Sequence, residues 1–166
     1  MVSDRYKGSE EVGPDNNQEA GSERLMRLGR EMKVERLKKV VTLAKKVGHV
    51  FVATADATGL PHVAAAGRIR LTPEEGRIAV EAWFCPGTVA NLQLNQNTSV
   101  VVWDPNGDNG YQLLGETEKV EDTAMMNGYG PGLEDKSAFP QVERRLSIRV
   151  DKIIDFRRSP HTDEEE

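Results

Sequence analysis

Five features in the middle of the chain have types and spacing that suit a flat, anionic ligand. The alanines 64–66 leave room for a planar group to approach backbone N–H and C=O groups. Trp83 and Phe84 follow on the next expected strand and are large enough to wall such a ligand. Thr88 starts an expected helix whose first amides would attract an anion, and Asn91 lies one turn further along. The pattern predicts a binding site for a planar molecule with a negatively charged end.

Each of these residues also has a purely structural explanation. Alanine permits tight packing, Trp83 and Phe84 suit a hydrophobic core, Thr88 can be a plain helix cap, and His62 can be a satisfied histidine on a strand. For any one residue taken alone, the structural explanation is the more frequent one. The prediction of a site therefore depends on the order of the features along the chain.

Other kinds of chemistry find little support in the sequence. The three histidines are spread along the chain and the single cysteine is Cys85, which does not give the clustered ligands that a zinc site needs. Cys85 has no evident base nearby in sequence and is expected to be a packing residue. Glu74, Glu75 and Glu81 are expected to be surface or turn carboxylates. The glycine-rich stretch 128–132 lacks dinucleotide-binding spacing and is expected to be a bend. We therefore predict no metal site and nominate no catalytic residue.

Composition limits the class of protein. With 166 residues, the chain is long enough for one domain with a substantial core. Its net charge of −5 argues against nucleic-acid binding, which depends on neutralising phosphates. We find no apolar run long enough to cross a bilayer and no N-terminal secretion signal. These observations predict a cytoplasmic protein that binds neither nucleic acid nor membrane.

The chain divides into a central domain and two polar ends. Residues 1–21 and 159–166 are acidic and have little to bury, so we expect disordered tails. The domain of residues 22–158 should begin with a helix capped by Ser22 and ended by Gly48 in a left-handed conformation. Apolar residues three and four apart give this helix one buried face. Its lysines and arginines are expected on the solvated face.

After Gly48 the pattern changes to short strands separated by turn signals. We expect a short helix over 88–95 and a less regular stretch over 123–140. The fold class is therefore mainly β, of the α+β type: a small antiparallel barrel with an N-terminal helix and short inserted helices. The six expected strands cover residues 49–55, 61–71, 77–84, 98–104, 111–122 and 144–156.

Three motifs together resemble the pyridoxamine 5′-phosphate oxidase-like family of FMN-binding split β-barrels. They are D-x-x-G-x-P-H at 56–62, T-x-x-N-L-x-x-N at 88–95 and G-x-x-x-x-x-x-D at 115–122. The similarity runs over roughly residues 34–157 as a succession of patterns. It implies a six-stranded split barrel that forms a homodimer, with one FMN at each of two equivalent sites between the subunits.

The resemblance also implies roles for individual residues. In such a protein residues 63–65 would border the isoalloxazine ring of FMN, and residues 82–85 would lie along it. Thr88 and Asn91 of the following helix would serve the phosphate end. Members that bind FMN often have a lysine or arginine immediately before the threonine, where this chain has Gly87. The phosphate would then depend on amides, on the threonine hydroxyl and on Arg68 or Arg70. The full set of expected cofactor-binding residues is Val63, Ala64, Ala65, Arg68, Ala82, Trp83, Phe84, Cys85, Thr88 and Asn91.

These expectations point to a flavoprotein oxidoreductase or electron carrier, in which the flavin performs the chemistry. Its electron donor would be a small molecule or a redox protein. Two alternatives remain open at this stage. One is a flavin-binding or structural dimer without turnover, and the other is a deazaflavin-dependent reductase on the same fold. Gly87 favours either alternative, whereas Thr88 and Asn91 favour FMN.

Overall fold

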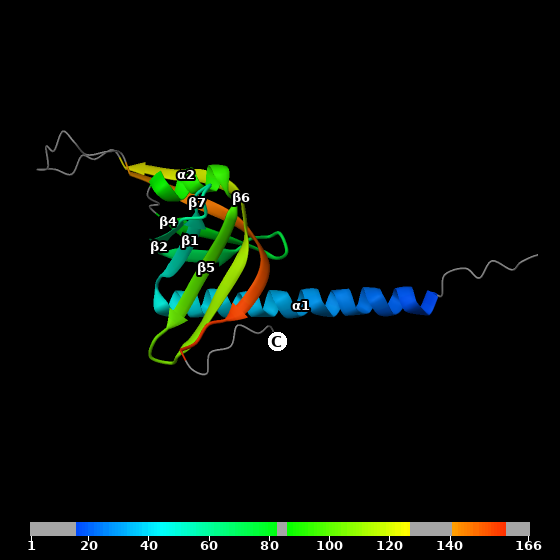
Figure 1. Cartoon of the computed structure of the whole chain (residues 1–166). Helices are drawn as coiled ribbons and strands as arrows, with labels where there is room; N and C mark the ends of the chain where they lie inside the picture. The colour runs from blue at the N-terminus through cyan, green and yellow to red at the C-terminus, as the bar shows by residue number, and fades with distance from the viewer. Residues whose placement is uncertain (1–15, 83–85, 127–140, 159–166) are drawn as a thin grey trace, which may run out of the picture.

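The computed structural model describes residues 16–82, 86–126 and 141–158 and shows a curled antiparallel sheet crossed by a long helix (Figure 1). No helix within these residues is long and apolar enough to span a membrane. The elements are α1 (Asn16–Val47), β1 (Val50–Ala55), β2 (Pro61–Ala66), β3 (Arg68–Leu71), β4 (Arg77–Ala82), α2 (Pro86–Leu94), β5 (Asn97–Asp104), β6 (Asn109–Met126) and β7 (Gln141–Asp155).

The order of the strands explains why the sheet closes. The seven strands form one sheet in the order β2-β1-β5-β6-β7-β4-β3, and every neighbouring pair is antiparallel. Strands β2 and β3 lie at opposite edges, yet only Gly67 separates them in sequence. Because consecutive Cα atoms are about 3.8 Å apart, the two edges must meet at Gly67. The sheet therefore curls into a barrel that is open between β2 and β3 except at this junction.

The core lies inside the curl and beneath helix α1. Along β5 the burial alternates strictly, as expected for a strand with one face toward the core. The central strands contribute fully buried aliphatic side chains that interdigitate with those of the helix. The largest of these buried side chains are Leu37, Ile78, Leu113, Leu146, Ile148, Val40, Val50, Val52, Val80, Val100, Val102 and Val150.

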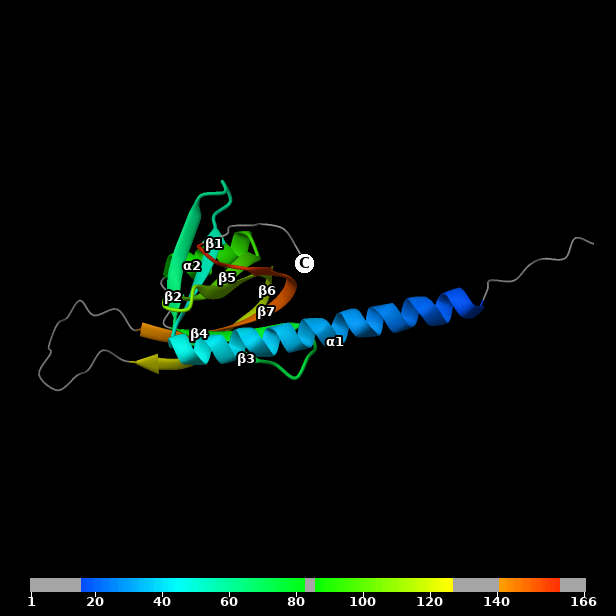
Figure 2. The same cartoon turned by 90° about the horizontal axis from the view of Figure 1, so that it is seen from below.

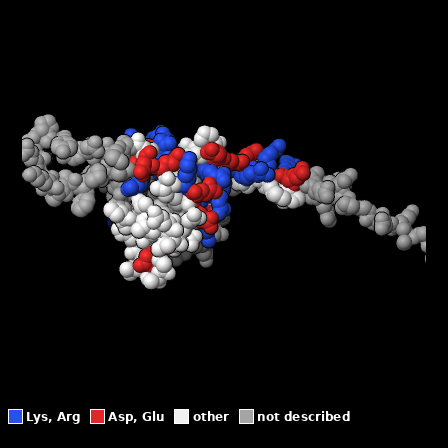
Figure 3. Space-filling view, turned by 90° about the horizontal axis from the view of Figure 1, so that it is seen from above, with Lys and Arg blue, Asp and Glu red and all other residues white. Residues whose placement is uncertain are grey.

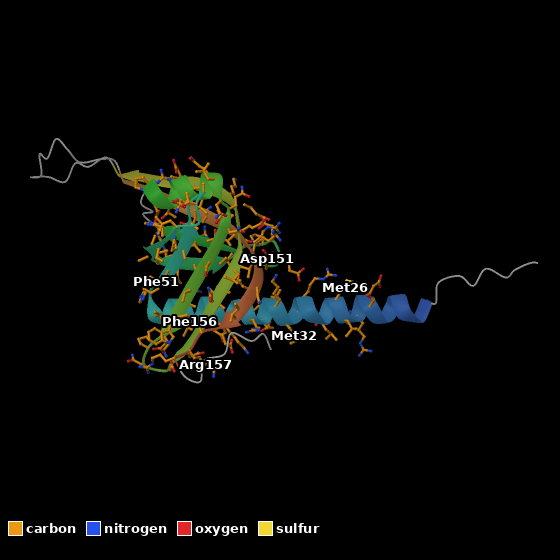
Figure 4. The ribbon with its side chains drawn as sticks, viewed as in Figure 1. Met26, Met32, Phe51, Asp151, Phe156 and Arg157 are labelled. Atoms are coloured by element: carbon orange, nitrogen blue, oxygen red, sulfur yellow. The ribbon has the colours of Figure 1, made fainter. Side chains whose placement is uncertain are left out.

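Only the C-terminal half of helix α1 contacts the barrel. Leu37, Val40 and Ala44 are buried against it, and the helix ends at Gly48, which has φ of 86° and donates its N–H to the Ala44 carbonyl at 2.8 Å. This confirms the predicted helix end. The N-terminal half projects away from the barrel, and its described side chains up to Met32 are exposed (Figures 2 and 4).

Several basic residues of α1 bind the barrel rather than facing solvent. Lys33 donates a hydrogen bond to the Val150 carbonyl, and Arg36 pairs with Asp155 at 2.9 Å. Lys46 pairs with the buried carboxylate of Asp104 at 2.7 Å. The expectation of a wholly solvated basic face was therefore wrong for these residues, because their long side chains reach polar groups on the adjoining strands.

The structure changes three other expectations. The described part of the chain forms seven strands rather than six, because the expected strand 61–71 is interrupted at Gly67. Helix α1 begins at Asn16, so Ser22 lies inside it and is not its N-cap. Helix α2 begins at Pro86, a residue suited to a first helical turn, so Thr88 is not the cap of that helix. The mainly β, antiparallel fold class is confirmed; residues 1–15, 127–140 and 159–166 lie outside the described part of the chain.

Candidate functional site

Strand β2 presents its predicted residues alternately to the two sides of the sheet. Val63 and Ala65 are exposed, whereas Ala64 is half-buried and packs against the core. Ala65 pairs with Phe51 of β1, which is also exposed (Figure 4). Of the three residues expected to border a flat ligand, two therefore lie on the outer side of the barrel and one faces inward.

The predicted residues of helix α2 hold that helix to the sheet. Asn91 donates a hydrogen bond from Nδ2 to the Thr54 hydroxyl of β1 at 3.1 Å. Thr88 is fully buried, with 0% of its surface exposed. Gly87 lies beside His62, whose Cε1 would be 3.9 Å from an added Cβ. These contacts fix the first turn of α2 against β1 and β2.

Two of the remaining predicted residues, Ala82 and Arg68, lie on neighbouring strands of the sheet. Ala82 is buried at the end of β4, where it pairs with Arg144 of β7. Arg68 is exposed at the start of β3. The expected aromatic wall and the cysteine (Trp83, Phe84 and Cys85) lie outside the described residues.

A cavity of about 420 Å³ opens beside Arg68, where the last turn of α1 meets β3 and β4. Small residues of α1, β4 and the Gly67 junction leave the space, and basic side chains surround it. The volume lies within the range of about 300–1,000 Å³ typical of small-molecule sites. Its lining residues are Ala44, Lys45, Gly48, Gly67, Arg68, Ile69, Arg70, Ala79 and Glu81.

Glu81 is the electrostatic centre of this cavity. Its Oε1 accepts hydrogen bonds from Arg70 at 2.6 Å and from Arg145 of β7 at 2.8 Å, and its Oε2 lies 3.9 Å from Arg68. The hydrogen bond from Arg145 lowers the pKa of Glu81 below its usual value, and the charges of Arg70 and Arg68 act in the same direction against the cost of burial. The Glu81 side chain is only 12% exposed, so the expectation of a surface carboxylate was wrong.

The cluster around the cavity carries more positive than negative charge. Arg68 pairs with Glu143 of β7 at 2.6 Å as well as facing Glu81. Four cations face two carboxylates, which leaves an excess of two positive charges to attract an anion. The cations are Lys45, Arg68, Arg70 and Arg145, and the carboxylates are Glu81 and Glu143.

Sequence reasoning named Arg68, and Arg70 as its alternative, but missed the other charged members of this cluster. Lys45 belongs to a helix whose basic residues were expected in solvent, and Arg145 lies far along the chain on β7. One signal was present in the sequence: the alternation of Arg68, Ile69 and Arg70 places both arginines on one side of a strand.

A second hollow, of about 460 Å³, lies on the outer side of β1, β5 and β6. Its lining is largely apolar and includes Ala53, Pro61 and Leu114, next to the exposed Phe51 and Val63. Viewed from above in Figure 3, the charged side chains gather along α1 and the neighbouring side of the barrel, while a broad area of the barrel carries none. Exposed apolar side chains such as Phe51 and Val63 beside an apolar hollow are typical of an interaction surface.

The chain matches one known protein family by sequence. A family described as pyridoxamine 5′-phosphate oxidase matches residues 37–146, which is more than half of the chain. No curated protein matches the chain by sequence. Among the described residues, no group of three His, Cys, Asp or Glu side chains is arranged to hold a metal ion.

Solved structures share the fold at low sequence identity. A pyridoxamine 5′-phosphate oxidase-related, FMN-binding protein from Nostoc punctiforme is 7% identical, with a TM-score of 0.54 over 74% of this chain and 83% of that one. An FMN-binding protein from Syntrophomonas wolfei is 15% identical, with a TM-score of 0.50 over 84% and 97%. HupZ of Group A Streptococcus is 17% identical, with a TM-score of 0.50 over 73% and 94%.

We predict that Glu81→Gln destabilises the protein in a pH-dependent way. Because the pKa of Glu81 in the folded protein lies below its ordinary 4.5, its carboxylate stabilises the fold above that pH. This contribution disappears as the pH falls through the lowered folded-state pKa. Urea unfolding should therefore show a gap in unfolding free energy between wild type and variant that is largest near neutral pH and shrinks as the pH is lowered below the ordinary pKa of glutamate.

Glu75→Gln, in the exposed turn before β4, is the matched control and should show no such gap at neutral or at acidic pH. A gap for Glu81→Gln that is equally large at both pH values would contradict the assigned role of the Glu81 charge.

Proposed function

The chain belongs to the pyridoxamine 5′-phosphate oxidase family, and on that premise we propose that it binds FMN and acts as a flavin-dependent oxidoreductase or electron carrier. The observation that carries the proposal is the cationic cavity beside the small-residue strand of a split barrel. A phosphate group of about two negative charges matches the excess of two positive charges there.

The residues present fit this cofactor in size and charge. The cavity is large enough for a small-molecule ligand. Strand β2 ends at the Gly67 junction beside it and carries the exposed residues Val63 and Ala65. Arg68 and Arg70 follow directly after the bend at Gly67. We propose that the ring lies against β2 and that the two arginines bind the phosphate.

Two observations favour the arginines over helix α2 as the phosphate site. Thr88 is fully buried, and the Asn91 side-chain amide is engaged with Thr54. Neither residue brings a charge, and Gly87 brings none either, whereas arginine forms charge-assisted hydrogen bonds to phosphate in a planar fork. In this proposal Thr88 and Asn91 position α2 and the segment before it rather than contacting phosphate.

The bound flavin would supply the transfer of hydride or of single electrons. We assign no residue as a general acid or base. Within the described residues, each carboxyl group with a shifted pKa has it lowered, through hydrogen bonds or through pairing with cations. A lowered pKa suits a counterion rather than a proton donor. Reduction by NADH or NADPH, with a flavin reductase added where needed, separates an enzyme from a carrier and from a flavin-binding protein without turnover.

We also propose a homodimer formed through the apolar outer side of the barrel. Phe51 and Val63 are 42% and 59% exposed, and the register places them beside Ala65 and Ala53 on adjoining strands. Burying such a face against a second copy removes apolar area from water at roughly 25 cal/mol per Å². A second copy is the occupant that the family resemblance implies, with FMN between the subunits.

Replacing Arg70 by Gln should weaken FMN binding about ten- to a hundredfold, because one charge-assisted hydrogen bond to phosphate is lost. Riboflavin, which lacks the phosphate, should bind wild type and variant equally. Fluorescence titration of both flavins measures the difference. Arg77→Gln, which removes an arginine paired with Glu118, serves as the control and should leave both affinities unchanged. A phosphate-specific loss in Asn91→Ala and none in Arg70→Gln would place the phosphate at α2 instead.

Val63→Glu should disrupt the dimer, because it would bury a carboxylate in an apolar interface. Light scattering after size-exclusion chromatography should then report half the wild-type mass, and FMN occupancy should fall. Leu25→Glu introduces the same charge at an apolar residue that is 70% exposed on the half of α1 that projects away from the barrel, and should change neither quantity. An unchanged mass and flavin content in Val63→Glu would contradict the proposed interface.

A further inference from the structure

The last turn of helix α1 lines the same cavity as the two arginines of β3. Ala44, Lys45 and Gly48 form one wall, and Arg68 and Arg70 lie on another. The two walls are 20 or more residues apart in sequence and meet because α1 packs across β3. A ligand in this cavity would therefore contact the helix as well as the strands.

Lys45 differs from the other cations of the cavity because it has no carboxylate partner among the residues that the structure describes. Arg70 is held by Glu81 at 2.6 Å, and Arg68 is held by Glu143 at 2.6 Å. The neighbouring Lys46 is paired with Asp104 at 2.7 Å. Lys45 forms no hydrogen bond or ion pair with any residue in the described ranges. Its ammonium group can thus bind an incoming anion without giving up an existing ion pair.

The end of a helix carries partial negative charge, which by itself would repel an anion. Two features offset this effect at the end of α1. Gly48 donates its N–H to the Ala44 carbonyl, which satisfies one of the terminal carbonyls. Lys45 places a positive charge in the last turn, where the charge of Lys46 is already balanced by Asp104. The end of α1 therefore contributes a positive charge to the cavity wall, which outweighs the repulsion of an anion by the helix dipole.

We propose that Lys45 completes a phosphate-binding site with Arg68 and Arg70, so that helix α1 contributes directly to recognition of a phosphate monoester. That the ester is FMN rests on the function proposed above; that the cavity binds a phosphate group does not. The ammonium group sits on a flexible stem and acts as a point charge, which suits it to close over a phosphate that the two guanidinium groups already orient.

The site also depends on the docking of α1. Leu37, Val40 and Ala44 anchor the same half of the helix that carries Lys45, and Arg36 ties it to Asp155. A bound phosphate bridging Lys45 to β3 would link the helix to the edge strand where the barrel is open. Phosphate-bearing ligands should therefore raise the melting temperature more than uncharged analogues do.

The test compares Lys45→Gln with Lys46→Gln in the full-length chain. Both remove one charge from the last turn of α1, but Lys46 faces Asp104 instead of the cavity. FMN and riboflavin are titrated by fluorescence, inorganic phosphate is titrated by calorimetry, and a thermal melt verifies that each variant is folded. Lys45→Gln should weaken FMN and inorganic phosphate binding about tenfold and leave riboflavin binding unchanged. Lys46→Gln should bind all three ligands as wild type does, and Lys45→Arg should retain most of the affinity.

The possible outcomes distinguish a failure of the proposed role of Lys45 from a failure of the proposed flavin-dependent function. If FMN binds and Arg70→Gln weakens it while Lys45→Gln does not, the role of Lys45 is overturned and the flavin proposal stands. If the wild type binds inorganic phosphate in a Lys45-dependent way but takes up no FMN, the phosphate site stands and the flavin proposal fails. If the wild type binds inorganic phosphate no better than Lys45→Gln does, the proposed site is overturned.

Discussion

The rest of the structure depends on the single-residue connection between β2 and β3. These strands are the two edges of a seven-stranded sheet, and the one residue between them obliges the edges to meet. The bend at Gly67 also shifts the alternation of exposed and buried residues by one position. The exposed side of β2, with Val63 and Ala65, therefore continues into the exposed side of β3, with Arg68 and Arg70. Closure of the barrel thus places an apolar strip next to a pair of cations.

The charge cluster at this junction contributes more to orientation than to stability. Ion pairs between exposed side chains are worth only about 0–1 kcal/mol, and Arg68 and Arg70 are 70% and 53% exposed. Glu81 is different because it is largely buried and accepts hydrogen bonds from two strands. By holding the arginines it defines one wall of the cavity, while the excess of positive charge remains for a ligand.

Sequence patterns predicted the individual helices and strands better than the contacts between them. Gly48 was expected to end the helix in a left-handed conformation, and it has a positive φ. The division of 61–71 was missed because only Gly67 separates the two halves in sequence. The pairing of β2 with β1 and of β3 with β4 is what reveals two strands. The role of Glu81 was missed for a similar reason: its partner Arg145 is 64 residues away, and no local pattern records such a contact. For the site, β2 and Arg68 were nominated from sequence, whereas Lys45 required the docked helix.

The central claim is that this barrel carries FMN, and the most direct test is the absorption spectrum of the purified protein with mass spectrometry of whatever denaturation releases. Our account predicts a flavin spectrum and released FMN, or full uptake of added FMN to about one per chain by a protein purified without it. A colourless protein that also refuses added FMN would contradict the account and would leave the deazaflavin and cofactor-free alternatives.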